Sequence, residues 1–154
     1  MFLAWANMRG VAAMAMVAAN CSKYGRLYTW AAAVDACPEG WHLPDTTEWN
    51  AFIVAVGGIE YAGQKLKADS DLWKHMDGIS NDDSYGFSAH PAGDRECNGE
   101  FDGDGYDARF WSASQDEVNS NYAYIMILYY NKDKAAMIDR GLDRAYSVRC
   151  LKDK

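Results

Sequence analysis

The stretch NYAYIMILYYN, residues 121–131, constrains the fold more than any other part of the chain. Successive side chains of a β-strand point to opposite faces, and in this stretch both faces are apolar. A strand of this kind has to be covered on both sides, as the inner strands of a packed sheet are. The stretch therefore predicts a central strand with a hydrophobic layer on each face.

Two further strands are predicted after it, at residues 134–139 (KAAMID) and 144–151 (RAYSVRCL). The segments Asn131-Lys132-Asp133 and Arg140-Gly141-Leu142-Asp143 supply the turns. In the last strand, Tyr146, Val148 and Cys150 alternate with Ser147 and Arg149, so the two sets are expected on opposite faces. The C-terminal third is therefore predicted to be a set of antiparallel strands.

The first third of the chain has helical signals instead. Residues 27–36 (LYTWAAAVDA) predict a short helix with Thr29 as N-cap, which Cys-Pro-Glu-Gly at 37–40 ends. Asp45 and Glu48 form the pattern of a capping box at the start of a second helix, which ends at Gly57-Gly58. The apolar residues of this second helix fall at i, i+3, i+4 and i+7 and predict one buried face: Trp49, Phe52, Ile53 and Val56.

Between the two helices, residues 41–43 (Trp-His-Leu) indicate a short extended segment. We interpret His42 as a hydrogen-bonded structural residue rather than a base or a ligand, because no second His or carboxylate stands at a catalytic spacing. Residues 60–110 are rich in Gly and Asp, without a long periodic segment, and are predicted to be loops. Two helices in the N-terminal half, a loop-rich middle and C-terminal antiparallel strands predict an α+β fold.

At 154 residues the chain has the length of one domain, which we place at residues 20–154. Residues 1–19 combine one cation, the ten-residue apolar run GVAAMAMVAA and the small residues Val17-Ala18-Ala19 before Asn20. This is the outline of a secretory signal peptide, and an atypical Ala/Met-rich segment at the edge of the domain is the alternative. The run is too short to span a bilayer, so no transmembrane span is expected.

Charge is unevenly distributed along the chain. The net charge of −7 argues against nucleic-acid binding, which needs a basic surface. Residues 69–117 hold 13 acidic and 3 basic side chains and are interpreted as solvated acidic loops or as a surface for cations. Asp102, Asp104 and Asp107 supply three carboxylates for a weak calcium site, although the spacing is not that of a twelve-residue calcium loop. No other cofactor is predicted.

The four cysteines are Cys21, Cys37, Cys97 and Cys150. No two of them have the CxxC spacing of zinc knuckles or thioredoxin-like sites. An even number of cysteines without metal spacing is typical of disulfides in an oxidising compartment, although four buried thiols of a cytosolic protein would give the same pattern. Spacing leaves all three pairings open.

Four ordered blocks resemble the Fibrobacter major paralogous domain family: residues 24–49 (YGRLYTWAAAVDACPEGWHLPDTTEW), 85–95 (YGFSAHPAGDR), 110–114 (FWSAS) and 145–153 (AYSVRCLKD). The resemblance implies a C-type-lectin-like fold, secretion or placement in the cell envelope of bacteria, and no established catalytic activity. It also implies a disulfide between Cys37 and Cys150 and a core position for Trp111. Cys21 and Cys97 are then either a second pair or free thiols.

On this scaffold we predict a non-catalytic binding or adhesion module whose unknown extracellular ligand is a carbohydrate or a protein. The candidate ligand-binding residues are aromatic and polar residues of the second half: Tyr106, Arg109, Tyr122, Tyr124, Tyr129, Asn131, Arg140 and Arg144.

Two alternatives remain. The first is an enzyme, of the formylglycine-generating type or a hydrolase with a carboxylate pair. The second is a structural display domain that oligomerises through a sheet edge, which Lys132, Lys134 and Arg144 are expected to guard.

Overall fold

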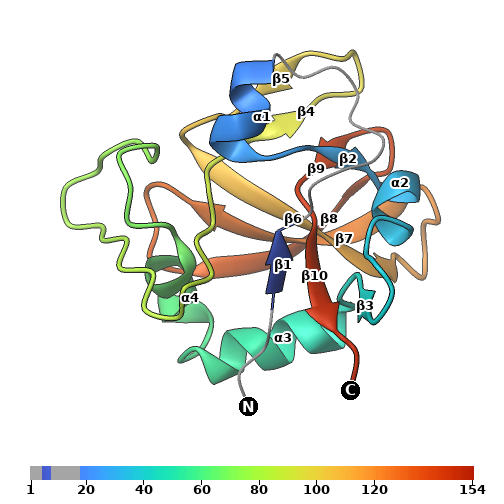
Figure 1. The fold of residues 1–154 in the computed structure, drawn as a ribbon, viewed down its shortest axis with the longest axis horizontal. Helices are drawn as coiled ribbons and strands as arrows, with labels where there is room; N and C mark the ends of the chain where they lie inside the picture. Colours follow the sequence, from blue (N-terminus) through green and yellow to red (C-terminus); the bar gives the residue numbers. More distant parts are fainter. Residues whose placement is uncertain (1–4, 8–17) are drawn as a thin grey trace.

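The computed structural model describes residues 5–7 and 18–154, which form a mixed α and β structure with mostly antiparallel sheets (Figure 1). The described helices are α1 (Ala18–Tyr24), α2 (Trp30–Val34), α3 (Thr46–Ala55) and α4 (Ile59–Leu66). The described strands are β1 (Trp5–Asn7), β2 (Tyr28–Thr29), β3 (Trp41–His42), β4 (Asp94–Arg95), β5 (Phe101–Asp102), β6 (Asp107–Gln115), β7 (Tyr122–Tyr129), β8 (Ala135–Gly141), β9 (Ala145–Tyr146) and β10 (Arg149–Lys152).

The longest strands form an antiparallel sheet in the order β6-β7-β8, so β7 is central as predicted. Met126 and Leu128 point from β7 into one hydrophobic cluster, and Ile125 and Ile127 point into another. All four side chains are almost completely buried. The prediction that this strand is covered on both faces is confirmed.

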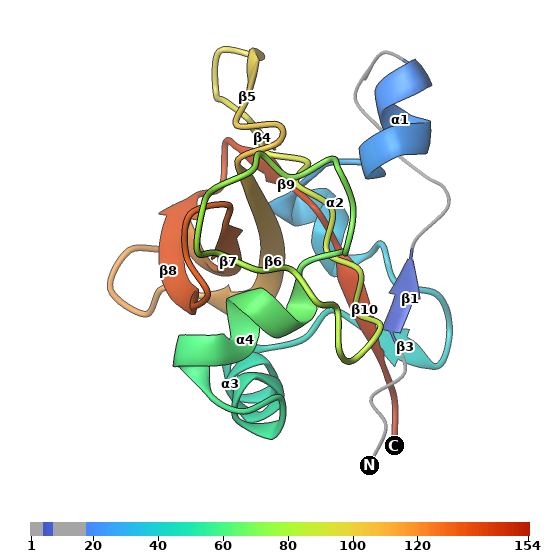
Figure 2. The same ribbon diagram turned by 90° about the vertical axis from the view of Figure 1, so that its left-hand side faces the viewer.

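The two clusters lie on opposite faces of this sheet. The first contains the buried faces of α3 and α4, which lie beneath the sheet in both ribbon views (Figures 1 and 2). The second contains Ala33 of α2, Trp111 of β6, Tyr146 of β9 and Cys150 of β10. Trp111 is fully buried, so its predicted core position is confirmed.

The predicted helix starts are both present. The side chain of Thr29 accepts a hydrogen bond from the backbone N–H of Ala32 at the start of α2. At α3 the carboxylate of Asp45 accepts from the N–H of Glu48, and the carboxylate of Glu48 accepts from the N–H of Asp45. The predicted face of α3 and its C-cap is buried as expected: Trp49, Phe52, Ile53 and Val56.

The prediction of two helices in the N-terminal half is wrong in number, because α1 and α4 are also present. Most of α4 lies in residues 60–110, which the sequence predicts to be loops because they contain no long periodic segment. The single glycine of α4 is explained by how the helix packs. A Cβ atom at Gly63 would lie 2.7 Å from the backbone oxygen of Asp133, so only glycine lets α4 approach the turn before β8 this closely.

The prediction of one strand at residues 144–151 is also wrong. β9 pairs with β2 and β4, whereas β10 pairs with β1 and β3 in a different sheet. Between them Ser147 bonds to β6, donating its N–H to Arg109 and accepting from the N–H of Trp111. Residues 60–110 are predicted to be loops, and residues 67–93 fit this prediction. β4, β5 and the start of β6 lie in the same range and are strands instead.

The disulfide that the family resemblance implies is present between Cys37 and Cys150, with a Cα–Cα distance of 5.7 Å. It ties the turn after α2 to β10. Cys97 is an exposed free thiol in the β4–β5 hairpin, and the side chain of Cys21 lies outside the described residues. The signal-peptide prediction also falls largely outside them and stays a prediction; of residues 1–19, the structure describes Trp5–Asn7, paired with β10, and the start of α1.

The disulfide generates a stability prediction. Replacing Cys37 and Cys150 together by alanine should lower the free energy of unfolding by about 4–5 kcal/mol, because the bridge closes a long loop in the unfolded chain. Urea unfolding followed by tryptophan fluorescence measures the change. Cys97→Ser is the matched control and should leave the midpoint unchanged, since this thiol is exposed. An equal midpoint for the double variant and the wild type would contradict the prediction.

Candidate functional site

The predicted ligand-binding residues do not form one site. Arg109 and Arg144 meet in a half-buried ion-pair cluster with Asp94. Tyr106 lies beside Tyr130, with ring centroids 5.1 Å apart. The others are distributed along β7 and β8 and the turn between them: Tyr122, Tyr124, Tyr129, Asn131 and Arg140.

The ion-pair cluster is internal. The carboxylate of Asp94, which is only 1% exposed, lies 2.7 Å from a guanidinium nitrogen of Arg109 and 3.2 Å from one of Arg144. Arg109 also pairs with Asp107 at 2.9 Å, and Arg144 pairs with Glu96. These contacts join β4, β6 and the turn before β9. Both arginines are therefore engaged by the protein's own carboxylates, and Arg144 does not guard the edge of β8.

Burial governs the acid–base behaviour of this cluster. It raises the pKa of Asp94 to about 6, although the positive charges of Arg109 and Arg144 act in the opposite direction. Burial also raises the pKa of Asp107, again against the lowering effect of Arg109. The carboxylates are costly to ionise in this place, so they depend on the arginines beside them.

The aromatic candidates on β7 have different environments. Tyr122 is exposed at the start of the strand, and Tyr124 and Tyr129 are half-buried. The ammonium of Lys132 lies 4.5 Å from the centroid of the Tyr129 ring. Arg140, at the end of β8, donates to the backbone carbonyl of Asp139. A role in ligand binding for these residues and for exposed Asn131 stays a prediction.

The acidic loop does not assemble a metal site in this structure. Asp102 and Asp104 are exposed, whereas Asp107 is buried against Arg109. Among the residues described, no group of three or more His, Cys, Asp or Glu side chains is placed to hold a metal ion. The calcium site rests on the sequence pattern alone.

His42 lies between two carboxylates. Its Nδ1 is 2.6 Å from Asp153 near the C-terminus, and its Nε2 is 2.9 Å from Glu48 of the capping box. The hydrogen bonds to Asp153 and Glu48 raise the pKa of His42, against the lowering effect of burial. The residue thus joins β3, α3 and the end of the chain, in keeping with its structural interpretation. Glu48 has two roles, because its carboxylate caps α3 and also bonds to His42. The sequence pattern indicates only the first of them.

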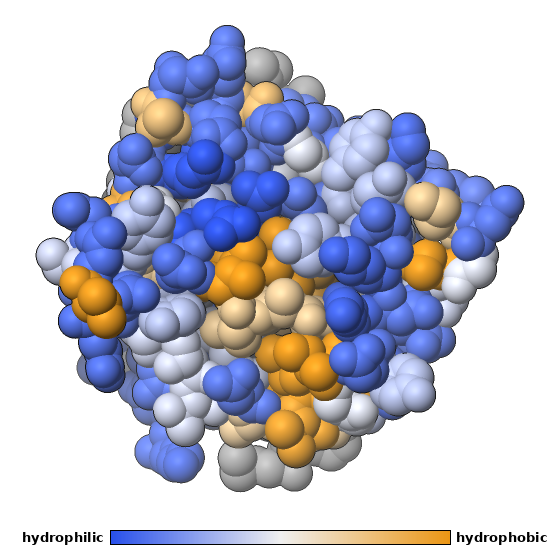
Figure 3. All heavy atoms as spheres, turned by 180° about the vertical axis from the view of Figure 1, so that it is seen from behind, coloured by the Kyte–Doolittle hydropathy of each residue, from blue (hydrophilic) through white to orange (hydrophobic). Residues whose placement is uncertain are grey.

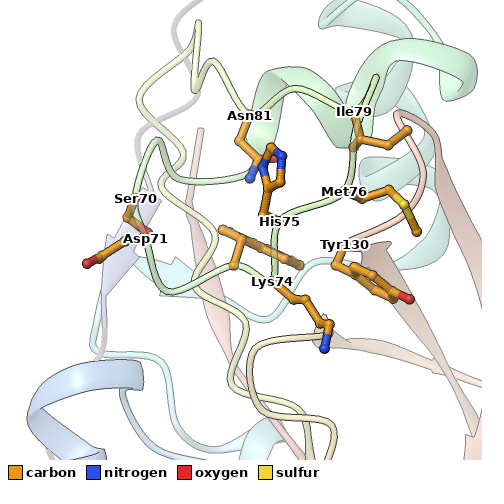
Figure 4. Close-up of a pocket in the computed structure, with 9 residues that line it drawn as sticks. Ser70, Asp71, Lys74, His75, Met76, Ile79, Asn81 and Tyr130 are labelled. Atoms are coloured by element: carbon orange, nitrogen blue, oxygen red, sulfur yellow. The ribbon is translucent and has the colours of Figure 1, made fainter.

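A pocket of about 520 Å³ lies between the loop of residues 70–81 and the end of β7. In Figure 4, Tyr130, Met76 and Ile79 lie on one side and Ser70 and Asp71 on the other, with Lys74 and Asn81 between them. The residues that line it are Ser70, Asp71, Trp73, Lys74, His75, Met76, Ile79, Asn81 and Tyr130.

Backbone bonds hold the two walls of the pocket in place. The N–H of Lys74 donates to the carbonyl of Gly105, and the N–H of Tyr130 donates to the carbonyl of Tyr106, both at 2.8 Å. The ammonium of Lys74 also donates to the hydroxyl of Tyr106 at 3.0 Å and lies 5.0 Å from its ring centroid. Tyr106 therefore links both walls, although it does not line the pocket itself.

A buried lysine supports the same walls. Nζ of Lys67 donates to the backbone carbonyls of Tyr129 and Lys132, which flank Tyr130. It also lies 5.5 Å from the centroid of the Trp73 ring, and Trp73 donates its indole N–H to the carbonyl of Ala89. Burial lowers the pKa of Lys67 to about 8.

Two polar groups of the pocket lining have unused hydrogen-bonding capacity. Ser70 Oγ and Asn81 Oδ1 are buried and have no hydrogen-bond partner in the part of the chain that the structure describes. Both oxygens are closed off from solvent, so a group in the pocket can bond to them only after the two side chains turn toward it. Sequence reasoning missed this site because its residues lie in a loop without any recognised motif.

Comparison with known proteins identifies one family that the chain matches. The model of the Fibrobacter succinogenes major domain matches residues 7–152, nearly the whole chain. The protein is therefore a member of the Fibrobacter succinogenes major domain family. No curated protein and no solved structure matches the chain.

The ion-pair cluster generates a prediction about Arg109. Arg109→Ala should lower the free energy of unfolding by about 3–5 kcal/mol, because it leaves Asp94 and Asp107 buried without their main counter-charge. Arg26→Ala, at a half-buried arginine between α1 and β2, should change it by no more than about 0.5 kcal/mol. Chemical denaturation at pH 7 measures both variants. Equal stabilities of the two variants would contradict the internal role of Arg109.

His42 generates a prediction about pH. Because its pKa is raised in the folded protein, its contribution to stability is complete below the unfolded pKa of about 6.5 and is lost as pH rises through the folded pKa. The stability difference between the wild type and His42→Gln should therefore shrink from pH 5.5 to pH 8.5. Solvent screening keeps the change below about 1 kcal/mol.

Urea titrations at these two pH values provide the measurement. His75→Gln is the control, since His75 is highly exposed and pairs with Asp77, two residues away in the same loop. A difference that grows with pH would show that His42 is not stabilised by Glu48 and Asp153 in this way.

Proposed function

We propose that this chain is a non-catalytic binding or adhesion module with a C-type-lectin-like scaffold, and that its ligand enters the pocket beside Tyr130. The observation that carries the proposal is the combination of a concave site, an aromatic and aliphatic wall, and the polar side chains of Ser70, Lys74 and Asn81 in the same lining. Small-molecule sites are typically concave, mostly apolar and equipped with a few polar groups of this kind.

The proposal places the protein outside the cytoplasm, secreted or associated with the cell envelope. A disulfide that closes most of the chain is typical of proteins that fold in an oxidising compartment. Among the described helices, none has the length and hydrophobicity that crossing a membrane requires.

The lining of the pocket supports binding over hydrolysis. A glycosidase of the usual type needs two carboxyl groups that flank the bond to be cleaved. Asp71 is the only carboxylate among the residues that line the pocket. Chemistry of the formylglycine-generating type needs a close pair of reactive cysteines, and Cys150 is joined to Cys37 instead.

A second candidate function, assembly, is supported by β8. This strand pairs on one side only among the described strands, and Ala136, Met137 and Ile138 are half-buried along it. Figure 3, which views the molecule from behind, shows hydrophobic residues gathered between hydrophilic ones, and β8 lies toward this face in Figure 2. Sedimentation of the full chain distinguishes assembly through this edge from a monomeric binder.

The proposed function is tested with an array that carries both glycans and peptides, probed with the oxidised full-length chain. Binding should be found, and Tyr130→Leu should weaken it at least fivefold, because the variant removes the aromatic ring but keeps apolar volume. Tyr61→Leu is the matched control, at an exposed tyrosine of α4 outside the lining, and should bind like the wild type. Binding that both variants retain would remove the pocket from the proposal.

A further inference from the structure

We propose that the pocket beside Tyr130 takes a neutral saccharide, bound without a metal ion. The inference rests on the proposed function and names the ligand class of that site. Three properties of the pocket carry it: its balanced charge, its combination of apolar and polar side chains, and its hydrogen-bonded backbone.

The first property is charge. With histidine neutral, Asp71 and Lys74 are the only charged residues of the lining, and they carry opposite charges. The surrounding segment 69–117 carries ten more acidic than basic side chains. An anionic ligand such as a phosphate or a uronic acid would meet this negative field without a compensating cluster of cations. The site therefore favours a neutral ligand.

The second property is the distribution of apolar and polar groups. Tyr130, Met76 and Ile79 lie together on one side of the pocket (Figure 4). The polar side chains of Ser70 and Asn81 belong to the same lining, and their oxygens have no hydrogen-bond partner among the described residues, so they are free to bond to a ligand once the side chains turn into the pocket. A pyranose ring has a C–H face that packs on an aromatic ring and a rim of hydroxyls that both donate and accept. This pattern fits the pocket, because serine and asparagine can each donate and accept as well.

The third property is the backbone. Besides the bonds of Lys74 and Tyr130, the N–H of Asp82 donates to the carbonyl of Gln64 in α4. The loop is thereby attached to the turn before β6 at Lys74 and to α4 just after its last residue, and the pocket is largely formed before a ligand arrives. Its volume of about 520 Å³ lies within the range of small-molecule sites, roughly 300–1,000 Å³.

A peptide fits the pocket less well than a sugar. Extended peptides gain affinity by pairing their backbone with the edge of a sheet. None of the lining residues belongs to a strand; they lie in the 70–81 loop and just beyond β7. An extended chain would find such an edge at β8 instead.

The experiment uses the oxidised full-length chain on an array of neutral, amino and acidic glycans together with peptides, followed by calorimetry with a neutral oligosaccharide that binds. Asn81→Leu should weaken this binding about tenfold, through the loss of one or two hydrogen bonds to the ligand. Its fold should be preserved, because Asn81 Oδ1 bonds to no other described residue. Asn98→Leu in the exposed β4–β5 hairpin is the matched control and should bind like the wild type.

The inference is supported if the array retains neutral glycans equally with and without EDTA, and if only Asn81→Leu and Tyr130→Leu weaken this binding. Retention of acidic glycans or peptides alone, still sensitive to Tyr130→Leu, would overturn the saccharide inference and leave the proposed binding function standing. Glycan binding that disappears with EDTA would overturn the metal-free site. An array without any hit, probed with protein whose disulfide is intact, would overturn both proposals.

Discussion

The structure depends on β7 being apolar on both faces. Ile125 and Ile127 face one hydrophobic cluster while Met126 and Leu128 face the other. Because both sets are apolar, a shift of the strand by one residue would again bury apolar side chains on each face, so hydrophobicity alone does not set the register. The register is held by the pairing of β7 with β6 and β8, in which Ile125 lies opposite Trp111 on one side and Ile138 on the other. What the two apolar faces do require is a cover on each side, which α3 and α4 provide on one face and the disulfide-linked segment on the other.

Tryptophans extend this constraint to the rest of the chain. The indole N–H of Trp111 donates to the carbonyl of Tyr28, that of Trp49 to Trp111, and that of Trp30 to Ser112. Each bond joins segments more than sixty residues apart in the sequence. A buried indole needs such a partner, because an unpaired N–H in the core is costly. Together with the Cys37–Cys150 bridge, these bonds attach the N-terminal segments to β6 and β10.

Local signals made part of this fold predictable. The capping box at Asp45 and the two-faced pattern of β7 depend on neighbouring residues, and both were identified correctly. α4 was missed because its eight residues are too few for a long periodic pattern, and its contact with the turn at Asp133 is made only in the folded chain. β9 and β10 were merged because Ser147, which separates them, is identified only by its bonds to β6. The pocket was missed for the same reason, since its walls come from segments fifty residues apart.

The pocket and the core are connected through one buried cation. Lys67 is fully buried, and its ammonium bonds to the two carbonyls that flank Tyr130 while lying over Trp73. A lysine inside a core is expensive, as its lowered pKa of about 8 shows. Packing alone would be served better by an apolar side chain of similar size. What the lysine adds is a fixed position for the turn that carries Tyr130. The cost of its burial is therefore best explained by the precision of the pocket wall, which ties the fold of this family member to its proposed site.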